Sequence, residues 1–209
     1  MKAVTMANDL ELAADALPDP TRPDAGLVLI SEWHTQSREE QKRVMSGVMD
    51  AWENTRLPAA YLSRYCLEGS DGRTILNYAQ WTNSDAHRAF AANPQNQQTL
   101  GNAIQSLFTA GPPGRYSLHR SIALREATVG YFTTASYDTE DPATARELAD
   151  ELAARSTAAA PSELIAEHFH ISEDGQRLYV LSAHEAEPAE ITARFRPFRG
   201  LARRWPVAT

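Results

Sequence analysis

The sequence lacks several features that would place it in common classes of protein. It contains a single cysteine, Cys66, which excludes an intramolecular disulfide framework and leads us to expect a reducing, cytoplasmic location. Positive charge is not in excess, since the net charge is -7, and this argues against nucleic acid as a partner. No apolar run approaches the roughly 18 residues of a membrane span, so we expect no membrane partner. We also expect no secretory signal, because the N-terminus lacks a basic start and a long apolar core.

Motifs of common cofactor and nucleophile chemistry are missing as well. The sequence has no Rossmann glycine pattern, no phosphate-binding loop and no nucleophile elbow. Three histidines on neighbouring predicted strands, His168, His170 and His184, have the residue type of a metal site. No carboxylate has a matching position, and we therefore predict that the protein has no metal site.

The chain does contain an ordered series of strand and helix patterns. Residues 1–25 hold three prolines among scattered acids and predict an extended arm, with a short amphipathic turn as an alternative near Leu10. The next patterns follow the order β-α-β-β-α-β of a ferredoxin-like unit. They are a strand at 26–34, a helix at 38–54, strands at 61–68 and 74–81, a helix from about 84 that Asn93-Pro94 interrupts, and a strand at 115–123.

The same order then begins again. The patterns are a strand at 128–136, a helix from Asp141-Pro142, strands at 164–171 and 177–184, a short helix at 188–200 and a last strand at 203–208. The two halves align weakly at an offset of about 104 residues. We therefore predict an α+β protein with an arm (1–25) and two ferredoxin-like domains (26–125 and 126–209). Packed sheet to sheet, the domains would form an intrachain dimeric α+β barrel, which predicts a monomer with an internal pseudo-dimer, or a weak homodimer.

The strand at 74–81 carries the residues with readable chemistry. Side chains alternate along a strand, so Asn77, Ala79 and Trp81 share one face. A small residue between an amide and an indole leaves room for a flat aromatic ligand, on which Trp81 can stack and to which Asn77 can donate a hydrogen bond. The alternative is structural, with Trp81 in the core and Asn77 as a satisfied polar group.

The stretch Ile75-Leu76-Asn77-Tyr78-Ala79-Gln80-Trp81, followed by a helix with Ala86, Arg88 and Phe90, resembles the antibiotic biosynthesis monooxygenase family. Within the family it is most similar to the small cofactor-independent anthrone oxygenases of aromatic polyketide pathways. The resemblance extends over about residues 26–120. It implies a cleft between sheet and helices, in which a polycyclic anthrone or phenol is oxidised to a quinone by O2 without metal or bound cofactor. Two alternatives are an oxygenase that uses reduced flavin, and a non-enzymatic aromatic-ligand-binding or pathway protein whose site has decayed.

This sequence departs from the family pattern at three positions. Two tyrosines of the family fall on Cys66 and His87, and an arginine falls near Leu100. We predict Asn77, Trp81 and His87 as catalytic residues, with His87 as a base near neutral pH. The alternatives are a surface or capping role for His87 and a core role for Cys66. The predicted substrate-binding residues are Trp33, Tyr65, Cys66, Ala79, Leu100 and Ile104.

We expect the second half to act mainly as the barrel partner. At the offset above, Leu181 falls opposite Asn77 and Glu185 opposite Trp81, so the amide and indole are not repeated. The arginines between Arg194 and Arg204 predict a solvated face that pairs with acidic surface.

Overall fold

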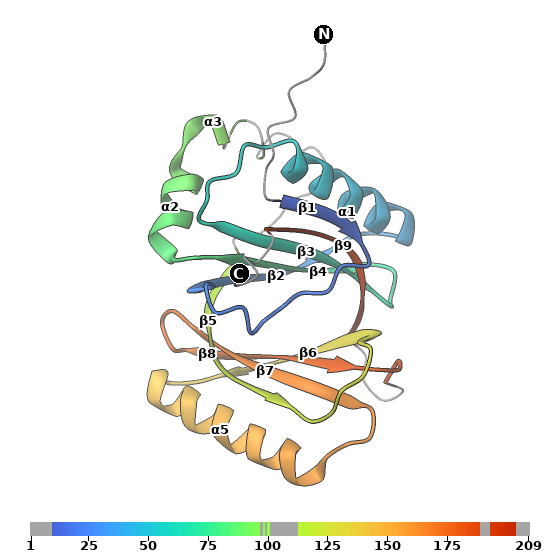
Figure 1. The fold of residues 1–209 in the computed structure, drawn as a ribbon, viewed down its shortest axis with the longest axis vertical. Helices are drawn as coiled ribbons and strands as arrows, with labels where there is room; N and C mark the ends of the chain where they lie inside the picture. The colour runs from blue at the N-terminus through green and yellow to red at the C-terminus, as the bar shows by residue number, and fades with distance from the viewer. Residues whose placement is uncertain (1–9, 97, 99, 101–112, 189–192, 204–209) are drawn as a thin grey trace, which may run out of the picture.

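Two sheets face each other at the centre of the molecule, with helices on both outer sides (Figure 1). The computed structural model describes residues 10–96, 98, 100, 113–188 and 193–203. The first half contains β2 (Leu27–His34), α1 (Arg38–Glu53), β3 (Tyr61–Gly69), β4 (Thr74–Trp81), α2 (Ser84–Ala92), α3 (Pro94–Asn96) and β5 (Gly114–Ala123). The second half contains β6 (Tyr131–Asp138), α5 (Pro142–Ala159), β7 (Leu164–Ser172), β8 (Arg177–His184) and β9 (Arg194–Arg203). The predicted α+β class is confirmed.

Helix α1 forms where the sequence predicts it. The Ser37 hydroxyl caps its start by accepting from the backbone N–H of Glu40 at 3.2 Å. The buried apolar face recurs at helical spacing. It comprises Val44, Met45, Val48, Met49 and Trp52.

Two long strands close the sheets into one barrel. Each half has the ferredoxin-like strand order, β3-β4-β2-β5 in the first and β9-β6-β8-β7 in the second. Strand β5 pairs briefly with β2 and then with β7 of the other half. Strand β9 likewise pairs briefly with β6 and then with β3. The predicted sheet-to-sheet barrel within one chain is therefore confirmed.

The sheets divide the apolar interior into three clusters. One fills the barrel between the facing sheets and includes Tyr78, Leu76 and Leu181. A second lies between the first sheet and α1, and a third lies under α5. The residues of the first half that face the helices rather than the barrel include Asn77 and Trp81. The candidate site thus lies outside the barrel, between sheet and helices.

Part of the predicted arm is built into the sheet. Strand β1 (Leu10–Ala14) pairs antiparallel with β9. Farther along, the Gln80 amide donates to the backbone oxygen of Asp19 at 2.8 Å, and Arg22 donates to that of Arg203 at 2.8 Å. These bonds attach the segment after β1 to both halves.

The predicted helix at 188–200 is wrong, because Arg194–Gly200 belong to β9. Pairing with β1, β3 and β6 gives this segment a ladder on both sides, and such tertiary pairing overrides local helical preference. Pro197 is tolerated because it lies at the register shift opposite Cys66 and Leu67. Most of the predicted strand at 203–208 lies outside the described residues. No helix in the described part of the chain is both long and apolar enough to cross a membrane.

Candidate functional site

Asn77 and Trp81 lie on the same face of β4, as alternation predicts. Both are buried against the helical side of the sheet, with 2% and 0% of their surface exposed. Ala79 lies between them on this face, while Tyr78 points into the barrel. The amide and the indole therefore share one buried environment.

The orientation of the Asn77 amide is set by its neighbours. Its Oδ1 accepts from Arg64 Nη2 at 2.9 Å and from Cys66 Sγ at 3.3 Å. An arginine can only donate, so the oxygen of the amide must face Arg64 and the nitrogen must point away from it. The Nδ2 atom is buried and has no hydrogen-bond partner among the described residues. Asn77 is thus held as a donor.

Arg64 is a member of the site that the sequence analysis missed. It pairs across from Ala79, whose small side chain leaves room beside it, and it is only 8% exposed. Its guanidinium carbon lies 5.4 Å from the centroid of the Trp33 ring and 4.8 Å from that of Trp52. The usable signal was strand alternation, which places Arg64 on the same face of β3 as Cys66.

Trp81 lies in an aromatic group. Its ring centroid is 5.4 Å from Tyr61, 5.1 Å from Phe90 and 5.1 Å from the His87 imidazole. Trp52 contacts Tyr61 and Phe90 in turn, at 5.5 and 5.9 Å. Such edge-on and tilted contacts fix the indole plane. The buried Trp81 Nε1 has no hydrogen-bond partner within the described part of the chain.

His87 is arranged as a hydrogen-bond donor rather than as a base. Burial, followed by the charge of Arg115, lowers the pKa of His87 to about 4. Arg115 Nη1 lies 2.8 Å from Nδ1, and because arginine must donate, the single proton of the neutral ring is on Nε2. Arg115 is itself held by Glu173 of the turn between β7 and β8, at 2.8 Å. The second half therefore helps to fix a residue beside Trp81.

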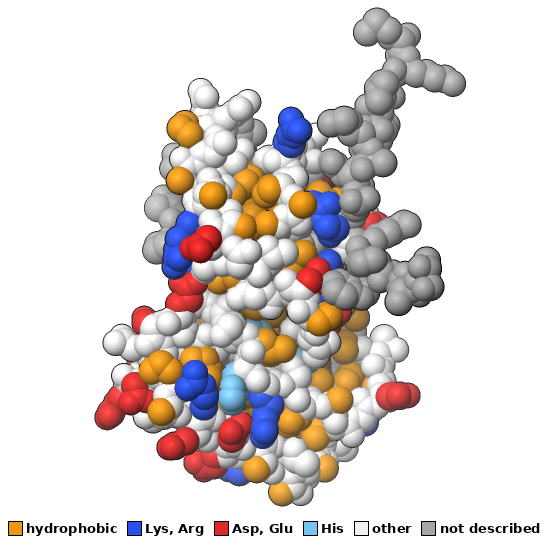
Figure 2. Space-filling model, turned by 60° about the vertical axis from the view of Figure 1, so that its left-hand side comes forward, with side chains coloured by type: hydrophobic (Ala, Val, Ile, Leu, Met, Phe, Trp, Pro, Cys, Tyr) orange, Lys and Arg blue, Asp and Glu red, His pale blue; other side chains and the backbone are white. Residues whose placement is uncertain are grey.

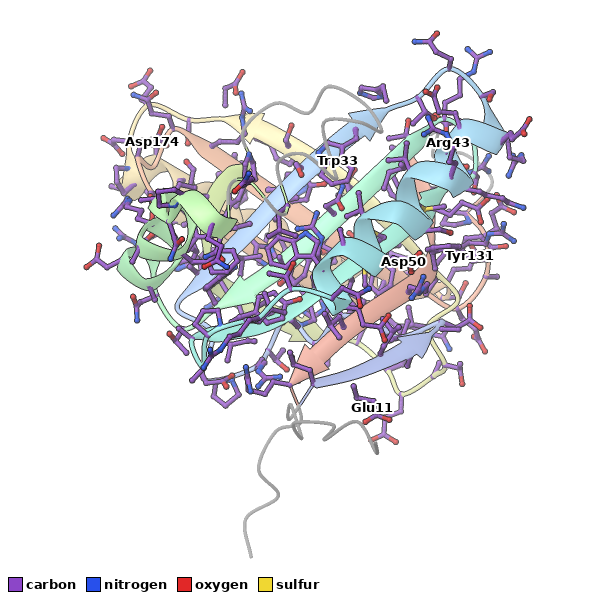
Figure 3. The ribbon with its side chains drawn as sticks, turned by 90° about the horizontal axis from the view of Figure 1, so that it is seen from above. Glu11, Trp33, Arg43, Asp50, Tyr131 and Asp174 are labelled. Carbon is purple, nitrogen blue, oxygen red and sulfur yellow. The ribbon has the colours of Figure 1, made fainter. Side chains whose placement is uncertain are left out.

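The structure brings most of the predicted lining residues to this face, but not all. The apolar cluster on the helical side of the first sheet includes four of them, Trp33, Cys66, Ala79 and Leu100. Figure 3 looks down on this helical side and shows Trp33 between α1 and α2. Tyr65 is not brought to the site, because alternation along β3 directs it into the barrel, where it packs with Tyr78. Ile104 lies outside the described residues.

Cys66 is completely buried. Burial raises the pKa of its thiol, and the nearby Arg64 charge offsets this in part. A thiol that stays protonated can donate to Asn77 Oδ1, which is the contact observed. Its position fits a structural role beside the amide.

The second half does not repeat the amide and indole. The equivalent hairpin turns contain Gly72 and Gly175, both at positive φ (72° and 71°) and 103 residues apart. This register corrects the predicted alignment by one residue, so that Val180 lies opposite Asn77 and His184 opposite Trp81. Under α5 the cluster is closed by small side chains, namely Ala145, Ala149 and Ala153.

The three histidines do not converge. His168 and His170 face the barrel, whereas His184 lies on the opposite face of its sheet, where its Nε2 contacts Thr133 Oγ1 at 2.9 Å. Among the described residues there is no group of three or more His, Cys, Asp or Glu side chains that could hold a metal ion.

Two cavities lie at one end of the barrel. One of about 590 Å³ is lined by residues that include Arg115, Tyr116 and Arg177. The other, of about 310 Å³, shares Tyr116 and Arg177 with it and extends to Glu32 and Trp33. Neither is lined by Asn77 or Trp81.

On the side of the molecule where α2 lies, acidic and basic side chains are mixed rather than gathered by sign (Figure 2).

Comparison with known proteins identifies the fold. No family model matches the chain, and no curated protein is significantly similar to it. Among solved structures, an anthrone oxidase-like protein has a TM-score of 0.70 at 11% identity, covering 95% of this chain and 99% of its own. A proposed monooxygenase from Fusobacterium nucleatum subsp. nucleatum has a TM-score of 0.54 at 8% identity, covering 86% and 94%. Another, from Lactobacillus acidophilus, has a TM-score of 0.52 at 10% identity, covering 86% and 96%. The chain therefore has the fold of the anthrone oxidase-like protein and of the two proposed monooxygenases.

Proposed function

We propose that the protein is a monooxygenase that oxidises a polycyclic anthrone or phenol to a quinone with O2, without a metal or a bound cofactor. The observation that carries the proposal is the Asn77 amide, whose oxygen is bound by Arg64 and Cys66 while its buried Nδ2 donor has no partner among the described residues, on the same face of β4 as Trp81. The shared fold with an anthrone oxidase-like protein supports the same reaction class.

The chemistry begins with an aromatic anion. The substrate loses a proton to water, and the anion transfers one electron to O2. The two radicals recombine to a peroxide at the ring carbon, and loss of water from the protonated peroxide leaves the carbonyl. One oxygen atom is retained in the quinone and the other leaves as water. The protein therefore has to stabilise the anion and hold the ring in place.

Each side chain has a role in this scheme. Asn77 Nδ2 donates to the ionised oxygen, and one such donor contributes roughly 10²–10³ in rate. Trp81 holds the ring by stacking. His87 supplies a second donor from Nε2, because Arg115 occupies its other nitrogen.

Turnover of emodin anthrone in air tests the proposal. Quinone formation is expected above the spontaneous rate and should fall by about 10²–10³ in Asn77→Ala. Trp81→Phe should also lose activity. Turnover that appears only after addition of reduced flavin would favour the flavin-dependent alternative instead. A rate equal to the background in the folded wild-type protein would contradict the oxygenase proposal.

A non-enzymatic role in binding aromatic ligands is the second candidate. The observation that favours it is the replacement of the two family tyrosines by Cys66 and His87, neither of which is arranged as a base. Tight aromatic binding without turnover, in the presence or absence of flavin, would support this role.

A further inference from the structure

Arg64 carries a buried positive charge without a carboxylate partner among the described residues. It is 8% exposed, and none of the ion pairs formed within the described part of the chain includes it. The sequence contains no acidic residue between Asp85 and Glu126, so no side chain in the segment 97–112 could supply a carboxylate to Arg64. A buried charge without a counter-charge is costly, and proteins rarely keep one without a use.

Two indoles contact this guanidinium. Trp33 and Trp52 lie 5.4 and 4.8 Å from its carbon, and their faces offset part of the cost of burial. One donor, on Nη2, is bonded to Asn77 Oδ1. The Nε donor is buried and has no partner within the described residues.

Other buried donors on this side of the sheet also lack a described partner. They are Asn77 Nδ2, Trp52 Nε1 and Trp81 Nε1. Trp52 and Trp81 both contact Tyr61 and Phe90, and Arg64 contacts both Trp52 and Asn77, so the side chains that carry these donors form one contiguous group. A buried group that offers donors and a positive charge is complementary to a ligand that offers acceptors and a negative charge.

We propose that Arg64 is the receptor for an anionic oxygen group carried by an aromatic ligand. The group is either an ionised phenol or a ring carboxylate, since both present the acceptors that a guanidinium binds. The inference rests on the proposed function for the location of the ring, and it adds that the ligand is bound as an anion. The neutral form of the same ring would leave the Arg64 charge uncompensated.

Binding to matched pairs of probes, measured by tryptophan fluorescence without oxygen, tests the inference. One pair is anthracene-9-carboxylate and the neutral 9-anthracenemethanol. The other is emodin and its trimethyl ether, above the pKa of the phenol. Wild-type protein should bind the anionic member of at least one pair about 10-fold more tightly or better. Preference in the first pair alone identifies a carboxylate, and preference in the second alone identifies a phenol. Equal affinities within both pairs would overturn the proposal.

Variants then assign the preference to Arg64. Arg64→Gln should abolish it, and Arg64→Lys should restore part of it. Arg125→Gln is the matched control, because Arg125 also has a buried Nε without a described partner but pairs with Glu185 in the second half. A folded Arg64→Gln that keeps the full preference would also overturn the proposal. The wild-type comparison decides the inference even if this variant does not fold.

Binding and turnover separate this inference from the proposed function. Selective binding of anions without quinone formation would support the Arg64 receptor and contradict the oxygenase. Quinone formation with equal binding of anionic and neutral probes would support the oxygenase and contradict the Arg64 proposal.

Discussion

Arg64 Nη2 lies 2.9 Å from Asn77 Oδ1, across the pairing of β3 with β4. This contact determines which end of the amide remains for a ligand. It also links Asn77, which the family resemblance indicated, to Arg64, which the resemblance did not include.

Replacing Asn77 by Asp should remove binding of anionic ligands without unfolding the protein. The side chains have the same shape, and the new carboxylate would form an ion pair with Arg64 while losing the Nδ2 donor. We expect anion affinity to fall about 10–100-fold, the range for a hydrogen bond to a charged group. Titration of the fluorescent probes and a thermal melt would measure both effects. Unchanged affinity would contradict the assigned orientation of the amide.

Replacing Trp81 by Ala should strongly destabilise the fold. The indole is completely buried among Tyr61, Phe90 and His87, and truncation of a large core aromatic costs about 3–5 kcal/mol. Urea denaturation would measure the change in the free energy of unfolding. Tyr137→Ala is the control, since Tyr137 is 38% exposed and its loss should cost about 0.5 kcal/mol or less. Equal losses in the two variants would show that the Trp81 environment is misassigned.

Removing the Arg115 charge should raise the pKa of His87. Burial is the larger cause of its low value, about 4, and Arg115 is the second, so Arg115→Gln should move the pKa only part of the way toward 6.5. NMR titration of the imidazole would follow the shift. The same spectra of the wild-type protein should show the proton on Nε2. A proton on Nδ1 would be incompatible with the observed contact.

Two histidines in the barrel should make the fold sensitive to acid. Burial lowers the pKa of His170 to about 3 and that of His168 to about 4. Because the folded-state values lie below the unfolded value near 6.5, the unfolded chain binds protons first as pH falls. Their contribution to stability is therefore fully present above pH 6.5 and is lost as pH falls toward 3–4.

The expected slope is up to about 1.4 kcal/mol per pH unit for each histidine. Protonation of His170 would also reverse its hydrogen bond with Tyr78, whose hydroxyl lies 3.1 Å from Nε2, because the protonated ring must donate there. Urea denaturation between pH 7 and 5 would measure the slope, and His170→Gln should reduce it. A free energy of unfolding that does not change over this interval would contradict the assignment.

Local patterns were sufficient for much of the fold and for one strand of the site. Alternation along β4 placed Asn77 and Trp81 on one face because a strand has a fixed side-chain period. The same rule also separates Tyr65 from Cys66, which are adjacent and cannot share a face. Arg64 was missed because its importance depends on two indoles from other elements, Trp33 and Trp52.

Features that depend on distant pairing could not be predicted in this way. The residues of β9 carry a weak helical pattern, and their strand conformation comes from three partner strands. The role of His87 is likewise set from outside its helix, by Arg115 and through it by Glu173. The alignment of the two halves was wrong by one residue. Such an error matters because a register shift of one residue moves every side chain of a strand to the opposite face of the sheet.

The position of β9 also has a consequence for the order of folding. As the chain leaves the ribosome, β3 has only β4 beside it until β9, more than 100 residues later, supplies the other neighbour. During that interval its outer backbone groups form an open sheet edge, which is a site for unwanted association. Closure over so long a sequence separation should be a slow, late step, and it should commit both halves to folding together.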